Sequence, residues 1–352
     1  MDQAGEIAES LRMIRDSAAA VAPRGDLRRI RALRFTDPGF ERATWEKMCA
    51  LGWPALALPE AEGGSGLGMR GFAALAEELG AGLVPEPLIG AAMAARVLCG
   101  APLAALLDGT SLVIPAWQER PNSLEAGADT ALSEGRLTGT KIFVPMAGGA
   151  DFFLVPARGG LALVPRDGTG LTLAMERTQD GGTFGTLTMD RAPAMPVPGR
   201  LERALEEATL AAAAYLLGVA RRAFAITLGY LATRVQFGRP IASFQALRHR
   251  AADLKIQWEL TRASVHAAAA TLDRESDLAA CRAAVSRAKA RAADAALLIT
   301  RQAVQLHGAI GYTDEADIGL FLRKAMVHAN LYGSAALHRG RYAALAPEEQ
   351  DG

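Results

Sequence analysis

The segment that most constrains this chain is Arg234 to Arg250, RVQFGRPIASFQALRHR. It opens with an arginine, a glutamine, a phenylalanine and a glycine in close succession. Pro240 then suits the first turn of a helix, and Ile241, Phe244 and Leu247 recur on one face of that helix. Taken alone the segment predicts only a helix start, since an exposed arginine is usually a solvated charge and Phe beside Gly is usually core or turn.

A second segment, Gln305 to Thr313 (QLHGAIGYT), narrows the choice, together with LRKA and LHRGRYA near the end of the chain. With the GWPALALPEAEGGSGLG stretch from Gly52 to Gly68, these motifs resemble the acyl-CoA dehydrogenase family over nearly the whole chain. The resemblance implies a flavin enzyme that forms the α,β-double bond of an acyl-CoA thioester.

Composition is consistent with a multidomain enzyme. Half of the 352 residues are hydrophobic, enough for a large core in two or three domains. The 38 basic and 38 acidic residues balance, which argues against nucleic acid or an anionic membrane surface as partner. Cys49, Cys99 and Cys281 stand far apart without metal-ligand spacing, so no disulfide framework and no metal site are expected. No signal peptide and no apolar run of about 18 residues are seen. We therefore expect a soluble, cytoplasmic protein without a membrane span.

The pattern predicts an α+β fold with three consecutive domains. Residues 1–105 form a helical domain, with helices at 12–20, 40–51, 69–79 and 89–99 and with Gly80 as a helix stop. Residues 106–200 carry short β-prone runs between Gly, Pro and Asp turns, which predict a small antiparallel barrel or sandwich. Residues 201–352 form a four-helix bundle, with helices at 202–233, 244–273, 277–308 and 316–345.

Desaturating a thioester removes an α-proton and passes the β-hydrogen to an acceptor as hydride, which no amino-acid side chain can accept. The resemblance implies that FAD fills this role, between the β domain and the bundle, and reaches a neighbouring subunit. A guanidinium matches phosphate geometry, and residues without bulk let main-chain amides come close. Carried over by position, the FAD contacts are Arg234, Gln236, Phe237, Ile241, Gln245, Gln305, Gly308 and Ala309.

The β domain departs from the family pattern at the flavin ring. Where the family has an aromatic residue and a hydroxyl donor, this chain has Phe143, Val144 and Pro145, and proline lacks even a backbone N–H. The Thr- and Gly-rich loop that covers flavin and substrate in the family is replaced by AWQERPNS, residues 116–123. The half-site offered by this domain is expected to be weakened or empty.

The catalytic base departs further. A general base here must be a carboxylate within reach of the α-carbon. The usual family position, in a Tyr-Glu-Gly-Thr stretch, falls on Tyr332, and the alternative position at the start of the first bundle helix falls on Ala208. Neither residue is a carboxylate. Glu207, one residue from the alternative position, is the candidate base in this chain, although an acidic residue at a helix start also suits the helix dipole.

These departures favour a subunit similar to the short bacterial members that pair with a complete homologue in heterotetramers acting on bulky thioesters such as steroid side chains. The partner then supplies the base, and electron-transferring flavoprotein is the electron acceptor that the family implies. Three alternatives stay open: a self-sufficient homo-oligomer that uses Glu207, a non-catalytic assembly subunit, and a flavin oxidase or monooxygenase of the same architecture.

Overall fold

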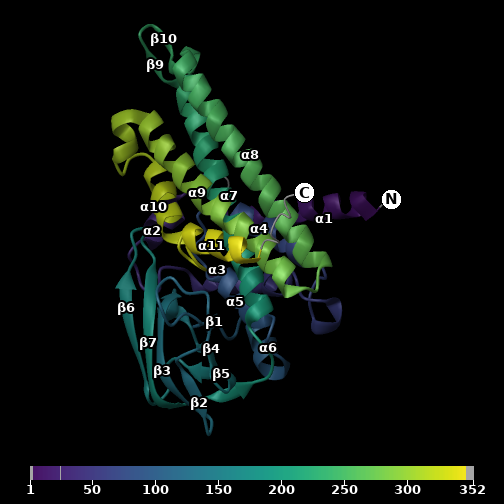
Figure 1. The fold of residues 1–352 in the computed structure, drawn as a ribbon. Helices are drawn as coiled ribbons and strands as arrows, with labels where there is room; N and C mark the ends of the chain where they lie inside the picture. The colour runs from purple at the N-terminus through teal and green to yellow at the C-terminus, as the bar shows by residue number, and fades with distance from the viewer. Residues whose placement is uncertain (1–2, 24, 346–352) are drawn as a thin grey trace. The chain divides into compact units, whose positions relative to one another are not determined.

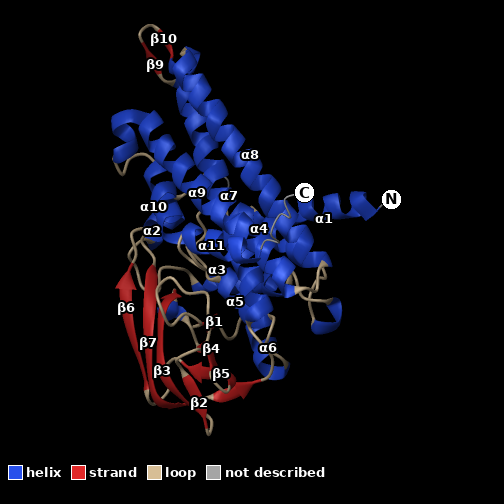
Figure 2. Cartoon of the chain, viewed as in Figure 1, coloured by secondary structure: helices blue, strands red, loops and turns tan. Residues whose placement is uncertain are grey.

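The computed structural model describes residues 3–23 and 25–345 (Figures 1 and 2). Helices come first, two small sheets follow, and long helices close the chain, which confirms the predicted α+β class. The first helices are α1 (Gln3–Ala18), α2 (Arg28–Leu33), α3 (Arg42–Ala50), α4 (Gly68–Ala81), α5 (Leu88–Ala95) and α6 (Gly100–Leu107). The short α2 and α6 are additions to the four predicted helices.

The strands form two four-stranded sheets, ordered β1-β4-β5-β8 and β2-β3-β7-β6. All of their pairs are antiparallel except β1 with β4, which is parallel. Buried leucines and valines line the inner positions, and turns separate the strands as the sequence pattern predicts. The strands are β1 (Val113–Pro115), β2 (Ala131–Ser133), β3 (Arg136–Pro145), β4 (Phe152–Ala157), β5 (Gly160–Pro165), β6 (Leu171–Arg177), β7 (Thr183–Pro193) and β8 (Met195–Val197).

The C-terminal helices are α7 (Glu202–Thr233), α8 (Gln245–Arg274), α9 (Leu278–His307), α10 (Ile318–His328) and α11 (Ala335–Leu345). Helix α9 packs against α8, α10 and α11, and about half of its buried residues are alanine. Alanine favours the helix and lets neighbouring helices approach closely. Asp277 begins α9 by accepting hydrogen bonds from the amides of Ala279 and Ala280, at 3.0 and 3.2 Å.

The fourth predicted bundle helix, 316–345, is wrong in one respect, because residues 329–334 break it into α10 and α11. Tyr332 and Gly333 take left-handed backbone angles, with φ of 58° and 99°. The Lys289 Nζ donates to the carbonyls of Ala329 and Gly333, at 2.8 and 2.9 Å. These carbonyls therefore bind a side chain from α9 instead of the amides of a continuing helix.

Gly80 is not a helix stop. It lies inside α4, and a Cβ at this position would lie 2.0 Å from the carbonyl oxygen of Tyr215 on α7. Gly218 on α7 has the converse role, since its Cβ would lie 1.8 Å from the carbonyl oxygen of Glu77. Helices α4 and α7 therefore meet backbone to backbone at two glycines, a contact that no larger residue permits.

The chain forms two compact units. Unit 1 comprises residues 1–27, 73–84 and 209–352, and unit 2 comprises residues 28–72 and 85–208, so that α4 and α7 contribute to both. The division into three consecutive domains stays a prediction. In the described part of the chain, α7 is the helix that is long and apolar enough to cross a membrane, and 78% of its most apolar window is buried inside the fold.

Candidate functional site

The two motifs that dominate the sequence lie at the same end of unit 1. After α7, the strands β9 (Val235–Gln236) and β10 (Arg239–Pro240) form a hairpin that projects from the bundle (Figure 1). After α9, the 3-10 turn η5 (Gly308–Tyr312) carries the second motif. The ring of Tyr230 stacks on that of His307, with centroids 4.4 Å apart, and joins the two helix ends. We call this region of unit 1, residues 230–245 and 305–312, the motif end.

The hairpin turn holds its side chains out from the bundle. Phe237 and Gly238 both have positive φ, 52° and 76°, as a two-residue hairpin of primed type requires. The Phe237 side chain is 90% exposed, and its ring meets the edge of Phe244 at 6.1 Å. The guanidinium of Arg239 lies over the same Phe244 ring, 4.3 Å from its centroid. Apart from this contact with Phe244, the ring of Phe237 is open to solvent.

Most of the proposed FAD contacts are open to solvent. Ile241 is half-buried, and the exposed members of the set are Arg234, Gln236, Phe237, Gln245, Gln305, Gly308 and Ala309. Within the described part of the chain the Arg234 guanidinium makes no hydrogen bond and no ion pair, so its donors are free for a phosphate. Gln236 donates to the neighbouring carbonyl of Val235, at 2.8 Å.

Gly308 gives the motif end an open backbone. Its φ of 65° and ψ of −145° lie in a region that only glycine occupies without strain, and no atom lies within 4 Å of where a Cβ would stand. An exposed guanidinium and an uncovered glycine backbone, both at this end of unit 1, are groups that can bind a pyrophosphate. The residues of the motif end therefore fit the diphosphate part of FAD.

The strand predicted to face the flavin ring has a bulge that the sequence pattern did not reveal. The register of β3 against β7 shifts between Lys141 and Val144, and Phe143 takes a φ of 55°. Phe143 is thereby 40% exposed, while Val144 is buried. Pro145 follows without an N–H. At residues 143–145 this strand presents an exposed aromatic ring and no side-chain hydrogen-bond donor.

The loop that replaces the family's Thr- and Gly-rich loop is fastened to the same strand. The Glu119 carboxylate accepts from the Nζ of Lys141 at 2.6 Å and from the amides of Asp129 and Thr130, both at 2.8 Å. Burial alone raises the pKa of Glu119, but these hydrogen bonds outweigh it and lower the pKa to about 2. Glu119 is thus an anchor of the loop and remains ionised.

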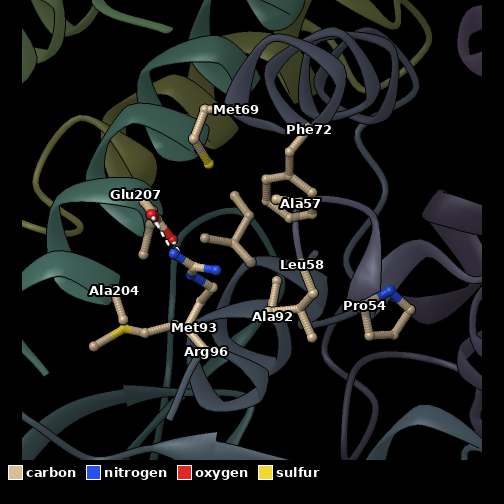
Figure 3. A pocket seen from close by; sticks show the side chains of 12 residues that line it. Pro54, Ala57, Leu58, Met69, Phe72, Ala92, Met93, Arg96, Ala204 and Glu207 are labelled. Carbon is tan, nitrogen blue, oxygen red and sulfur yellow. Dashed lines mark hydrogen bonds and ion pairs between the residues drawn. The ribbon is translucent and has the colours of Figure 1, made fainter. Parts of the chain in front are cut away.

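Glu207 lies in unit 2, where two arginines occupy its carboxylate. Arg96 Nε lies 2.8 Å from one oxygen (Figure 3), and Arg203 Nε lies 3.2 Å from the other. Ala208 and Glu207 line a small cavity of about 20 Å³, with Met69, Phe72 and Met93 among its apolar walls. Such a volume holds about one water molecule and no acyl chain. Sequence reasoning missed Arg96, because nothing local links it to Glu207.

Tyr332, at the usual position of the family base, is buried in the 329–334 turn. Burial raises the pKa of its phenol above the ordinary value, so it stays protonated. Its carbonyl lies 2.8 Å from Nε2 of His338, which must be the protonated nitrogen because a carbonyl only accepts. Burial, with a smaller effect from Lys289, lowers the pKa of His338 to about 3, so this imidazole is neutral.

No cluster of three or more His, Cys, Asp or Glu residues suited to a metal occurs among residues 3–23 and 25–345. Cys49, Cys99 and Cys281 form no disulfide bond, and burial raises the pKa of the Cys49 thiol to about 12. The Cys49 thiol therefore stays protonated near neutral pH.

Comparison with known proteins agrees with these observations. The family model "Acyl-CoA dehydrogenase, C-terminal domain" matches residues 199–345, and "Acyl-CoA dehydrogenase, N-terminal domain" matches residues 8–107. The chain is 33% identical to acyl-CoA dehydrogenase IpdE2 of Mycolicibacterium smegmatis, over 93% of this chain and 96% of the relative.

Two solved structures are similar over almost the full chain. A variant of the Tcur3481-Tcur3483 steroid ACAD has 30% identity and a TM-score of 0.88, covering 96% of this chain and 98% of that one. The ChsE4-ChsE5 complex from Mycobacterium tuberculosis has 26% identity and a TM-score of 0.85, with the same coverage of both chains.

Proposed function

The chain belongs to the acyl-CoA dehydrogenase family of FAD-dependent oxidoreductases, and from that premise we propose that it works as one subunit of a heteromer whose homologous partner supplies the catalytic base. The reaction is formation of the α,β-double bond of an acyl-CoA thioester. This chain contributes its motif end to a flavin at the contact between unlike subunits.

The observation that carries this proposal is the absence of a free carboxylate at either family base position. Tyr332 is a buried phenol, and the side chain of Ala208 has no polar atom. Glu207, beside the second position, has its oxygens engaged by Arg96 and Arg203. A carboxylate bound in this way must break two charge-assisted contacts before it can accept a proton. The base is therefore expected in another chain.

In the assembled enzyme, the residues of the motif end bind and orient the cofactor. Arg234 would neutralise the diphosphate of FAD, and Gly308 would let it approach the main chain. Phe237 would offer its exposed ring to the adenine side, and Gln305 would offer its side-chain amide to the cofactor as a hydrogen-bond donor. When bound, FAD accepts the electron pair that leaves the substrate's β-carbon.

The proposal of an unlike partner has two supports. Exposed apolar side chains gather at the motif end: Val235, Phe237, Ile310 and Tyr312 are 53, 90, 40 and 75% exposed. Such a patch marks a protein interface. In addition, one of the two similar structures is a complex of two proteins, ChsE4 and ChsE5, and the other is described as Tcur3481-Tcur3483. We extend the proposal to a bulky acyl group of the steroid side-chain kind, to electron-transferring flavoprotein as acceptor and to the cytoplasm.

The deciding experiment is to purify this chain alone and together with a co-expressed homologous acyl-CoA dehydrogenase, and to measure flavin absorbance at about 450 nm per mole of protein. We expect a colourless single chain and a yellow complex that bleaches with an acyl-CoA thioester. A full flavin complement in the single chain, with bleaching, would establish the self-sufficient homo-oligomer instead.

Two further readouts separate the remaining alternatives. Arg234→Ala should lower the flavin content of the complex, and unchanged flavin would mean an assembly subunit. Slow reoxidation of the reduced flavin by oxygen is expected for a dehydrogenase, whereas fast reoxidation would mean an oxidase or monooxygenase.

A further inference from the structure

Unit 1 contains a cavity of about 290 Å³, and none of the FAD contacts proposed above lines it. Its walls come from the segment that follows α1, the end of α4, the middle of α7 and the start of α10. The volume is at the lower end of the range for small-molecule sites. No step of the proposed reaction uses this cavity.

Small residues keep the cavity open. Ala22, Ala81, Gly82 and Ala225 line it where larger side chains would fill it. Gly25 lies closest to the charged wall: a Cβ there would stand 3.2 Å from Nη2 of Arg222, and its φ is 88°. The backbone therefore approaches a guanidinium without covering it.

Two consecutive arginines on α7 face different surroundings. Arg221 lies 3.3 Å from Glu77 and 2.8 Å from Glu78, so its charge is balanced. Arg222 makes no hydrogen bond or ion pair with any residue in the described ranges, although it is half-buried. The donors of its guanidinium are therefore left to solvent or to a ligand in the cavity.

The other charged groups on the wall limit what can bind. Glu78, which pairs with Arg221, and Asp317, at the start of α10, are both carboxylates on this wall. A multiply charged anion is therefore repelled, and a single negative charge is tolerated. Leu27 and Ile226 supply apolar wall next to the charges. This combination suits a monoanion with a short hydrocarbon part.

We propose that this cavity binds a short-chain monocarboxylate, with its carboxylate on the Arg222 guanidinium and its chain against Leu27 and Ile226. A guanidinium and a carboxylate form two parallel charge-assisted hydrogen bonds, which fix the orientation of the ligand. Titration of the single chain needs neither flavin nor the partner subunit, so the test does not depend on the proposed function.

The test is isothermal titration of the purified chain with hexanoate, hexylamine and inorganic phosphate. Hexanoate should bind, and the two probes of other charge should bind at least about tenfold more weakly. Arg222→Gln should weaken hexanoate binding about tenfold or more, because the charge-assisted pair is lost. Arg301→Gln, at an exposed arginine of α9 in the same unit, is the matched control and should leave binding within about twofold.

A second variant locates the ligand. Ala225 is exposed at the cavity mouth, so Ala225→Phe should fold normally and block hexanoate. Circular dichroism checks that each variant is folded. Equal hexanoate affinity in Arg222→Gln and the parent, equal binding of hexylamine, or binding that survives Ala225→Phe would each overturn the proposal. Absence of hexanoate binding at millimolar concentration would do the same.

Discussion

Lys289 is the residue with the most unusual surroundings in unit 1. It is fully buried, and its amine donates to two main-chain carbonyls of the 329–334 turn rather than to a carboxylate. Burial lowers its pKa from 10.5 to about 7. His338 binds a third carbonyl of the same turn, that of Tyr332. Two basic side chains thus hold the turn in which the family carries its base.

This arrangement predicts a pH dependence of stability. Lys289 binds its proton more weakly in the folded protein than in the unfolded chain, so between about pH 7 and 10.5 the unfolded chain holds more protons. The free energy of unfolding should therefore rise with pH through this window. Lys289→Met removes that rise and leaves two carbonyls unsatisfied, at about 1–3 kcal/mol each.

Urea unfolding of the parent and of Lys289→Met at pH 6 and pH 9 measures the effect. The stability advantage of the parent should be larger at pH 9. Lys255→Met, at a half-exposed lysine of α8, is the control. Equal advantages at both pH values would contradict the assignment of the pH dependence to Lys289.

Glu207 supports a second prediction at the residue scale. If the partner holds the base, Glu207→Gln in the assembled enzyme should leave turnover within about twofold, and weakening of the contacts to Arg96 and Arg203 should cost about 1–3 kcal/mol of stability. Glu202→Gln, at the exposed start of α7, is the control. A loss of turnover of about 10²-fold or more would identify Glu207 as the base.

Among the elements, the turn that ends α9 has the backbone geometry on which the proposed cofactor contact depends. Gly308 ends the helix with φ of 65° and ψ of −145°, and its outer side is empty. Gly308→Ala should therefore cost about 1–3 kcal/mol of stability through strain. It should also lower the flavin content of the complex, because the added methyl group would stand where we propose that the diphosphate approaches.

The control for this substitution is Gly229→Ala on α7, where the φ is ordinary and the space is also empty. Alanine there should be neutral or stabilise the helix by about 0.5–1 kcal/mol. Thermal unfolding and flavin absorbance report the two effects separately. Normal flavin content in Gly308→Ala would place the diphosphate elsewhere.

At the scale of the whole molecule, assembly is expected to depend on the exposed apolar side chains of the motif end, because the chain has a net charge of zero. Tyr312 and Ile310 lie on η5 and are 75 and 40% exposed. We predict that replacing both by serine prevents assembly with the partner, because an interface loses apolar area there. The melting temperature of the single chain should change by less than about 2 °C, because neither side chain is buried in it.

Light scattering after size-exclusion chromatography measures this assembly. Substitution of the exposed Leu51 of unit 2 by serine is the control and should leave the complex intact. A complex that forms normally from the double variant would exclude η5 from the interface.

The sequence by itself determined the α+β class, the order of helical and β segments, the family, and the lack of a carboxylate at the two family base positions. Hydrophobic period, turn residues and short motifs are local properties, and they survive without knowledge of the fold. Three bundle helices were predicted within one or two residues of α7, α8 and α9.

Only the tertiary structure decided which distant residues meet. It joined the two motifs through Tyr230 and His307, paired Glu207 with Arg96, and left Arg222 beside an open cavity. It also broke the last predicted helix, since Lys289 binds carbonyls that a helix would otherwise use. Such pairings depend on how whole elements pack, and packing depends on side chains far apart in the chain.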